Sequence, residues 1–265
     1  MPALEITTTI PCTNMCDYCP QSILLKKYGR SNQHMMLNTF KQCMSNVPKK
    51  VEIHFSGYSE CFLNVDCIDF IEYTQQQGYE EIHLYTTLVG LNYEQLQRLS
   101  VIKFKNICLH LPDDERVMKY NVTKEYIHIV DEFIKIFNPK SIVVYGKLNK
   151  SLIPVVPHYS SNINNNALHS RANNLPHLKS NPRLNGKIGC RAVNCRRPLD
   201  RVVLLPDGNV ALCCMDYNLQ HIIGNLTNMQ FDQIFQTPQY KFVEKGLDDD
   251  SLNILCRNCQ EAVKC

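Results

Sequence analysis

Three cysteines in one short loop constrain this chain more than any other feature. Cys12, Cys16 and Cys19 follow one another as C-x3-C-x2-C, directly after a strand-like run at residues 4–10. Cysteine thiolates are the ligands of iron–sulfur clusters and of structural zinc. A structural zinc site needs four ligands, and no further Cys or His follows until His34. Three thiolates on one loop instead favour a 4Fe–4S cluster whose fourth iron takes a non-protein ligand, with zinc or unrelated buried cysteines as the alternatives.

Composition limits the class of protein. The 265 residues, 44% of them hydrophobic, are enough for one large globular domain with or without a small appendage. A net charge of +3 is far below the basic balance of nucleic-acid-binding proteins. Residues 1–5 lack the start of a signal peptide, and no apolar run reaches the ~20 residues that span a bilayer. Fourteen cysteines without a secretion signal indicate a reducing compartment. We therefore expect a cytoplasmic protein with neither a nucleic acid nor a membrane as its partner.

Strand-like and helix-like segments alternate through the first part of the chain. After the strand at 4–10, strands are predicted at 51–55, 81–86, 105–111 and 141–145, and helices at 31–46, 66–73, 93–99 and 123–137. This alternation predicts an α/β fold, an open partial (β/α)6 barrel with parallel strands. The ends of such strands meet at one edge of the sheet. The cysteine loop, the turn at Gly57 and the pair Thr86-Thr87 all follow strand ends, so we expect them to share one site.

The pattern changes after residue 150. Residues 151–187 are rich in Pro and Asn and predict an irregular loop without strands. Further along, we predict a hairpin from 201–205 to 210–214, and helices at 229–235 and 240–245.

The loop from Cys12 to Cys19, with the aromatic Tyr18 before its last cysteine, resembles the radical S-adenosylmethionine (SAM) enzymes. In that superfamily the amino and carboxylate groups of SAM chelate the fourth iron. The resemblance implies that Cys12, Cys16 and Cys19 hold a 4Fe–4S cluster, with Tyr18 beside the cofactor. It implies reductive cleavage of SAM to a 5′-deoxyadenosyl radical, which abstracts hydrogen from an unactivated carbon. An external donor such as flavodoxin or ferredoxin would supply the electron.

The segment Ser56-Gly57-Tyr58-Ser59-Glu60 follows a predicted strand, where a glycine lets a ligand approach the backbone. Taken alone, it predicts only a turn. In the resemblance it takes the place of the Gly-Gly-Glu-Pro motif that holds the amino group of SAM, although Tyr58 and Ser59 alter the middle and Cys61 replaces the proline. We expect Gly57, Tyr58, Ser59 and Glu60 to contact SAM, with the Glu60 carboxylate on its ammonium group.

Polar residues also end two later strands. Thr86 and Thr87 lie where related enzymes contact the ribose or carboxylate of SAM, although β-branched residues favour strands without any ligand. His110 and Asp113 could face a substrate, but a solvated loop or a core histidine explains them equally well.

A second set of cysteines lies in the C-terminal region. Cys195, Gly208 and Cys213 are spaced C-x12-G-x4-C, and Cys256 and Cys259 follow. The set resembles the SPASM or twitch domain of radical SAM enzymes, which carries auxiliary iron–sulfur clusters. It implies one auxiliary 4Fe–4S cluster, with the ligands Cys195, Cys213, Cys256 and Cys259 and with Cys190, Cys214 and Cys265 as substitutes. A zinc ribbon is the alternative, because four thiolates in two pairs bind zinc equally well.

The resemblance covers nearly the whole chain, as a radical SAM core at 1–150, a linker and substrate loop at 151–189 and a SPASM/twitch domain at 190–265. The layout is most similar to 2-deoxy-scyllo-inosamine dehydrogenase-like enzymes, and less so to anaerobic sulfatase-maturating enzymes. Sugar-oxidising members carry an arginine upstream of the first auxiliary cysteine. Arg171, with the neighbouring His169, matches it and is the candidate catalytic group, although an arginine in a polar loop is ordinarily solvated.

These features predict a radical SAM oxidoreductase that oxidises an alcohol of a small substrate, such as a carbohydrate or aminocyclitol. The auxiliary cluster would accept the electron left after hydrogen abstraction. A cysteine that returned a hydrogen would make an epimerase instead, with Cys61, Cys108 and Cys214 as candidates. A peptide-modifying enzyme and a non-enzymatic iron–sulfur electron carrier are further alternatives. The carrier would need no SAM site, so the turn from Gly57 to Glu60 argues against it.

Overall fold

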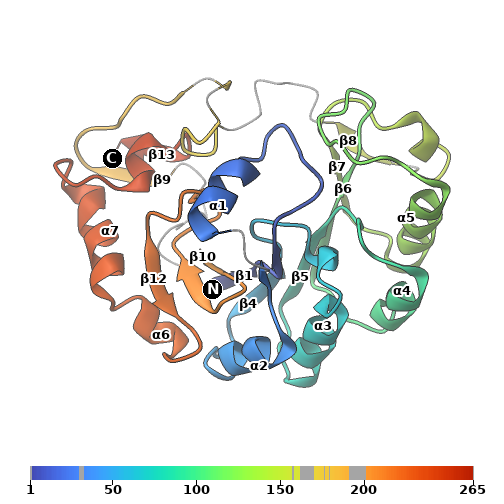
Figure 1. Ribbon diagram of the computed structural model, residues 1–265, viewed down its shortest axis with the longest axis horizontal. Helices are drawn as coiled ribbons and strands as arrows, with labels where there is room; N and C mark the ends of the chain where they lie inside the picture. The colour runs from blue at the N-terminus through green and yellow to red at the C-terminus, as the bar shows by residue number, and fades with distance from the viewer. Residues whose placement is uncertain are drawn as a thin grey trace.

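The computed structural model describes residues 2–29, 33–156, 158–161, 170–175, 177–178, 180–190 and 201–264. Within these ranges the chain is built around one nine-stranded sheet in the order β12-β11-β10-β1-β4-β5-β6-β7-β8 (Figure 1). Its strands are β1 Ala3–Ile6, β4 Glu52–Phe55, β5 Ile82–Thr86, β6 Asn106–Leu111, β7 Ser141–Val144, β8 Ser160–Ser161, β10 Arg201–Leu204, β11 Asn209–Ala211 and β12 Ile222–Asn225. The strands from β10 through β1 to β8 run parallel, as expected for a partial barrel.

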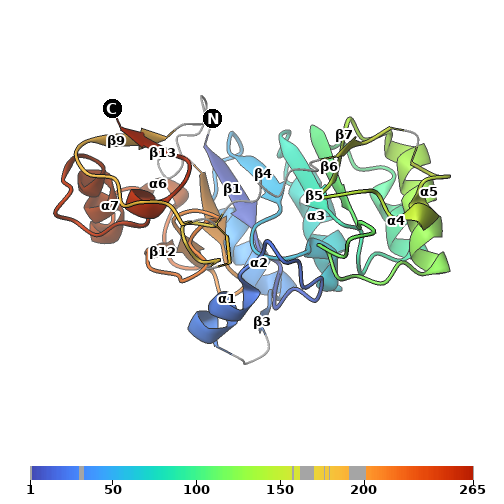
Figure 2. The same ribbon diagram turned by 90° about the horizontal axis from the view of Figure 1, so that it is seen from above.

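One face of the parallel strands is apolar. Side chains on this face with no exposed surface include Leu4, Ile6, Ile53, Phe55, Leu84 and Leu109. They occupy alternate positions because successive side chains of a strand point to opposite faces. Helices α2 Leu37–Ser45, α3 Cys67–Gln76, α4 Tyr93–Leu99 and α5 Lys124–Phe137 lie along this part of the sheet (Figures 1 and 2). The opposite face is left for polar residues such as His54 and His83.

Local signals set the ends of these helices. Asn92 forms a capping box with Gln95 at the start of α4, and Thr123 Oγ1 accepts a hydrogen bond from the backbone N–H of Tyr126 at the start of α5. Helix α3 ends just before Gly78, whose φ of +80° is the left-handed conformation that a helix C-terminus favours. Each helix returns the chain to the edge at which the parallel strands begin. The loops that follow the strands therefore gather at the opposite edge.

The C-terminal part of the chain extends the same sheet. Strand β10 pairs parallel with β1, with Ala3 opposite Arg201, and β11 and β12 continue it as antiparallel strands. The predicted hairpin is therefore confirmed. Helices α6 Phe231–Ile234 and α7 Pro238–Asp248 follow, and β13 Ala262–Lys264 pairs with β9 Ile188–Cys190 in a separate two-stranded sheet (Figure 1).

The N-terminal segments differ from the sequence expectation in two places. The run 4–10 is interrupted after Ile6, because Thr7 and Thr8 bond to the turn after β4 through their hydroxyl groups. Its end, β2 Thr9–Ile10, pairs antiparallel with β3 Gln33–His34. Helix α2 consequently begins at Leu37 rather than at residue 31. Helix α1 Gln21–Tyr28 was not predicted, because Leu24 is its only fully buried residue and gives no apolar period.

The prediction for the segment after residue 150 was also wrong in one respect. It was expected to contain no strand, but Ser160–Ser161 forms β8 against β7. A strand of two residues is too short to show an alternating pattern. The 3-10 helix Lys150–Leu152 stands where a regular unit would have an α-helix. In the described ranges no helix is both long and apolar enough to cross a membrane.

Candidate active site

The cysteine loop is anchored to the chain that follows β6. The backbone N–H of Asp17 donates to the carbonyl of Val117 at 2.8 Å, and that of Lys119 donates to the carbonyl of Asn14 at 3.1 Å. The Asn14 side chain is buried and donates to Thr87 Oγ1 at 2.9 Å. The loop is thus held across the strand ends, where its sulfur atoms can face a common space.

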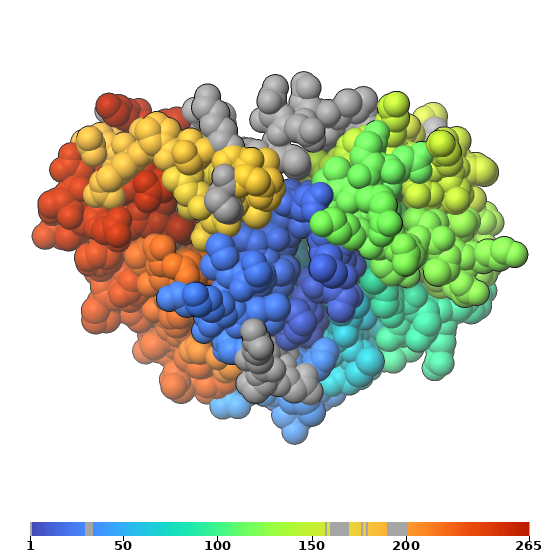
Figure 3. All heavy atoms as spheres, turned by 45° about the horizontal axis from the view of Figure 1, so that its top comes forward, coloured from blue at the N-terminus to red at the C-terminus, as the bar shows by residue number. Residues whose placement is uncertain are grey.

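A pocket lies at this edge of the sheet. Its lining residues are Cys12, Asn14, Cys16, Tyr18, Cys19, Ser56, Gly57, Tyr58, Ser59, Glu60, Tyr85, Thr86, Thr87, His110, Arg171 and Tyr217. In the space-filling view, the surface is hollowed beside the N-terminal segment (Figure 3). The predicted cluster ligands, the predicted SAM contacts and Arg171 therefore line one pocket. His169 lies outside the described residues.

The three loop sulfurs fit a cluster better than a single metal ion. Burial raises the pKa of Cys12 to about 11 and that of Cys16 to about 12, so both thiols need a metal nearby to become thiolates. In a tetrahedral zinc site, sulfurs about 2.3 Å from the ion stand about 3.8 Å apart. Among the described residues, the loop cysteines are not a group whose ligand atoms all lie within 4.8 Å of one another. A cluster has one thiolate on each iron and accepts this wider spacing.

Two residues that the sequence analysis missed contact Cys19. The hydroxyl of Tyr217 lies 3.5 Å from the Cys19 sulfur, and the Gln21 side-chain amide lies at the same distance. Gln21 also donates to the carbonyl of Tyr58, so it joins the cysteine loop to the turn after β4. Tyr217 is separated from Cys19 by 198 residues in sequence, and no local pattern could have revealed the contact.

The turn after β4 depends on Gly57. Its φ is +87°, and a Cβ atom there would lie 2.3 Å from Thr7 Oγ1. The same Thr7 hydroxyl accepts a hydrogen bond from the backbone N–H of Tyr58 at 3.1 Å. The Tyr58 side chain is buried, and its hydroxyl donates to the carbonyl of Cys213 at 2.7 Å. The turn is therefore fixed on one side by β1 and on the other by the C-terminal part of the chain.

Glu60 is buried beneath the pocket and accepts several hydrogen bonds. Its Oε1 accepts from Thr86 Oγ1 at 2.7 Å, and its Oε2 accepts from the Thr87 backbone N–H at 2.5 Å and the Thr87 hydroxyl at 2.6 Å. Burial raises the pKa of the Glu60 carboxyl, while the hydrogen bonds from Thr87 and Thr86 act in the opposite direction. Two of the donors are hydroxyls that can rotate, so lone pairs on both oxygens can be released to a cationic ligand.

Arg171 enters the pocket from a strained turn. Arg171, Ala172 and Asn173 have φ values of 51°, 53° and 65°, a left-handed conformation that each side chain disfavours by about 1–2 kcal/mol. The Asn174 amide holds this turn by donating to the carbonyls of Arg171, at 2.7 Å, and Met215, at 3.3 Å. Strain maintained by tertiary contacts is typical of functional residues.

Aromatic and imidazole rings complete the wall next to Arg171. Arg171 Nε lies 3.4 Å from the carbonyl oxygen of Tyr18, whose ring packs 4.6 Å from that of Tyr145. Burial, reinforced by the Arg171 charge, lowers the pKa of His110 to about 4, so its imidazole is neutral at neutral pH. Asp113 is not among the residues that line the pocket. Its carboxylate instead accepts hydrogen bonds from the backbone N–H groups of residues 117 and 118.

The described C-terminal cysteines lie close to the core. Cys256 and Cys259 are joined by a turn in which the Cys259 N–H donates to the Cys256 carbonyl at 3.2 Å. Burial raises the pKa of both thiols, and that of Cys256 reaches about 12. The nearby Cys214 thiol raises the pKa of Cys259 further. Cys213 is buried at the end of the hairpin. Cys195 and Cys265 lie outside the described residues, as does the side chain of Cys190.

Comparison with known proteins identifies one domain and the overall fold. Residues 195–260 match the family model SPASM, described as an iron-sulfur cluster-binding domain. The structure of BtrN in complex with AdoMet and 2-DOIA superposes with a TM-score of 0.63 at 19% identity, over 98% of this chain and 93% of BtrN. Residues 195–260 are therefore a SPASM domain, and the chain has the same fold as BtrN.

Two further structures share the radical SAM fold. SuiB of Streptococcus suis bound to the precursor peptide SuiA has a TM-score of 0.59 at 12% identity, over 97% of this chain and 69% of SuiB. The anSMEcpe structure with bound AdoMet has a TM-score of 0.55 at 15% identity, over 97% of this chain and 86% of that one. No curated protein matches the sequence. The SPASM match indicates an iron–sulfur cluster in the C-terminal region of this chain. AdoMet is bound in the BtrN and anSMEcpe structures.

Proposed function

We propose that this radical SAM enzyme oxidises a secondary alcohol of a small substrate, such as a carbohydrate or aminocyclitol, to a ketone. The observation that carries the proposal is that Arg171 lines the same pocket as the three loop cysteines and the turn from Gly57 to Glu60. When bound, SAM and its cluster supply a 5′-deoxyadenosyl radical that removes a hydrogen atom from carbon, and the auxiliary cluster accepts the electron left behind.

The chain positions the cofactor and the alcohol. Cys12, Cys16 and Cys19 would hold the SAM cluster, and Glu60 would bind the ammonium group of SAM. Tyr18 and Gly57 would lie beside the cofactor, with Thr86 and Thr87 orienting the Glu60 carboxylate. In the C-terminal region the proposed ligands are Cys195, Cys213, Cys256 and Cys259. The proposed boundaries remain 1–150 for the core, 151–189 for the linker and 190–265 for the SPASM/twitch domain.

Arg171 is the group proposed to act on the substrate hydroxyl. In the described part of the chain no carboxylate forms an ion pair with its guanidinium, whose contacts are the Tyr18 carbonyl and, at 3.7 Å, the Met215 sulfur. A cation in this position stabilises the negative charge that develops as the hydroxyl loses its proton. The neutral imidazole of His110 can accept a hydrogen bond in the same pocket. His169 stays a candidate on sequence grounds alone.

Two other reactions compete with the oxidation. SuiB bound to the precursor peptide SuiA and anSMEcpe bound to the Kp18Cys peptide share this fold, which favours a peptide substrate as the second candidate. An epimerase would need a thiol that returns hydrogen to the substrate. Among the described residues, the cysteines that line the pocket are those of the loop; Cys61, Cys108 and Cys214 do not line it, which favours the oxidation. An external electron donor, such as flavodoxin or ferredoxin, is part of either proposal.

The test uses anaerobically reconstituted protein, a strong reductant and candidate cyclitols or nucleotide-linked sugars that carry deuterium at the reacting carbon. We expect a ketone, one 5′-deoxyadenosine per turnover, and deuterium in that 5′-deoxyadenosine. Arg171→Lys should lower turnover by about 100-fold or more while both clusters remain, because a point charge does not reproduce the planar contact. Arg183→Lys is the matched control, since Arg183 is exposed and bonds to the carbonyl of Asp250.

Other products would contradict the oxidation. A product that keeps its oxidation state and gains one solvent hydrogen on carbon identifies an epimerase. Turnover of a peptide, with all alcohols inert, identifies a peptide-modifying enzyme. Equal activity of Arg171→Lys and Arg183→Lys would remove Arg171 from the mechanism.

A further inference from the structure

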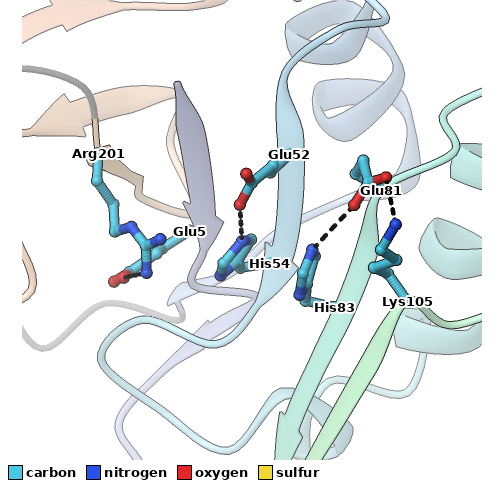
Figure 4. A network of polar contacts seen from close by, with 7 residues as sticks. All are labelled: Glu5, Glu52, His54, Glu81, His83, Lys105 and Arg201. Carbon is cyan, nitrogen blue, oxygen red and sulfur yellow. Dashed lines mark hydrogen bonds and ion pairs between the residues drawn. The ribbon is translucent and has the colours of Figure 1, made fainter. Parts of the chain in front are cut away.

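Two histidines and a glutamate meet on the polar face of the sheet, toward the strand starts and away from the pocket. His54 in β4 lies directly opposite His83 in β5, and Glu52 lies two residues before His54 on the same face (Figure 4). The distance from His54 Nε2 to Glu52 Oε2 is 3.0 Å. One ligand atom from each of the three side chains lies within 4.8 Å of the others. The strand pairing itself therefore gathers three metal-binding groups.

His83 supplies an independent sign of a missing ligand. Its Nε2 atom is buried and has no hydrogen-bond partner, and the closest ion-pair distance, to Glu81 Oε2, is 3.8 Å. A buried polar atom without a partner costs roughly 1–3 kcal/mol, so such atoms usually bind something.

The charges around this group favour a cation. The seven residues of Figure 4 include three carboxylates, from Glu5, Glu52 and Glu81. They include two cationic side chains, Arg201 at 3.9 Å from Glu5 and Lys105 at 2.9 Å from Glu81. The carboxylates of this group therefore outnumber its cationic side chains by one. A divalent cation would therefore enter a site of opposite charge.

We propose that Glu52, His54 and His83 form a zinc site on this polar face of the sheet. Two imidazoles and one carboxylate are a ligand set that zinc accepts, with a fourth position open to water, and without thiolates the set does not suit an iron–sulfur cluster. Zinc with ligands at about 2.0–2.1 Å holds them about 3.4 Å apart in a tetrahedron. The Glu52–His54 pair is already this close, and a bound zinc would draw in the His83 nitrogen, which lies within 4.8 Å of the other ligand atoms.

The site would tie β4 to β5 beneath the pocket. The ring of His54 stacks on that of His83 at 4.3 Å and on that of Tyr85 at 5.6 Å. Tyr85 lines the pocket. Zinc bound to the two histidines would thus restrain Tyr85, although the zinc site itself does not depend on which substrate the enzyme uses.

The test titrates zinc chloride into reconstituted protein that holds its clusters, after a chelator has removed adventitious metal. We expect one zinc per chain beyond the iron, with X-ray absorption at the zinc edge showing nitrogen and oxygen ligands. His83→Gln and Glu52→Gln should lose this zinc and keep their iron. Glu52 is partly exposed, so its variant removes a charge with little risk to folding. His128→Gln, at an exposed position of α5, is the control and should bind zinc as the unmodified chain does.

Three results would overturn the proposal. These are an unmodified chain that binds no zinc, a zinc whose ligands are sulfur, and a His83→Gln variant that binds zinc as tightly as the unmodified chain. None of them bears on alcohol oxidation, which is measured separately by product and deuterium transfer.

Discussion

At the scale of single residues, the pocket depends on a few side chains that do two things at once. The Thr7 hydroxyl accepts a hydrogen bond from the turn after β4 and also occupies the space that a side chain at Gly57 would need. Tyr58, where the related motif has a small residue, reaches across to the carbonyl of Cys213. The departures of this chain from the family pattern therefore have structural partners of their own.

Gly57→Ala should destabilise the chain more than Gly78→Ala, by about 1–3 kcal/mol. Both glycines have positive φ, at +87° and +80°, so the backbone strain of the two variants is similar. Only the Cβ at Gly57 meets an atom within 4 Å. Chemical denaturation compares the free energies of unfolding, and SAM binding to the reconstituted protein should weaken only in Gly57→Ala. Equal unfolding free energies of the two variants would show that the turn can shift away from Thr7.

At the scale of elements, Cys256 lies in a short 3-10 helix, Leu255–Asn258, that has little stability of its own, and Cys259 directly follows it. Arg257 in this element has no exposed surface. Its guanidinium donates to the carbonyls of Leu184, at 3.1 Å, and of Gly186 and Gly246, each at 2.5 Å. One buried arginine thus joins the linker, α7 and the turn that places Cys256.

Arg257→Met should lower the free energy of unfolding by roughly 3 kcal/mol or more, because it leaves several buried carbonyl groups without donors. Arg183→Met, which removes an exposed arginine that also bonds to a carbonyl, should cost less than about 1 kcal/mol. The measurement is the denaturant midpoint of the reconstituted proteins, with iron content recorded alongside. If Arg257→Met unfolded at the same denaturant concentration as the unmodified chain, water would have to replace the arginine at the three carbonyl groups at no cost in stability.

At the scale of the whole molecule, the two regions that carry the cysteine sets share one continuous sheet. Strand β10 begins the C-terminal region and pairs with β1, the strand that leads into the cysteine loop. The Tyr58 hydroxyl and the Tyr217 hydroxyl each cross from one part to the other, toward Cys213 and Cys19 respectively. The sets are nevertheless separate in sequence, so each should assemble its own cluster.

Anaerobically reconstituted protein should hold about eight iron atoms per chain, in two 4Fe–4S clusters. Replacing Cys12, Cys16 and Cys19 together by Ala should leave about four. Cys43→Ala, at a buried cysteine of α2, should keep the full number. Iron analysis with Mössbauer spectroscopy measures the outcome. Zinc in place of iron at the C-terminal cysteines would contradict the auxiliary cluster.

The sequence by itself determined the features that local pattern carries. Alternating strands and helices indicated the parallel sheet, since the period of apolar residues reflects the face that each element buries. Cysteine spacing predicted both cluster sets, and the SPASM match confirms an iron–sulfur cluster-binding domain at residues 195–260. The strand ends located Gly57, Glu60, Thr86 and Thr87, which line the same pocket.

Only the tertiary structure decided which distant residues meet. It assigned Thr86 and Thr87 to the Glu60 carboxylate, Tyr217 and Gln21 to the Cys19 sulfur, and Arg171 to the pocket wall. It also set His54 beside His83, a contact that follows from the register of two strands rather than from either strand alone. Such contacts depend on strand order and register, which arise when the whole core packs and leave no period in the local sequence.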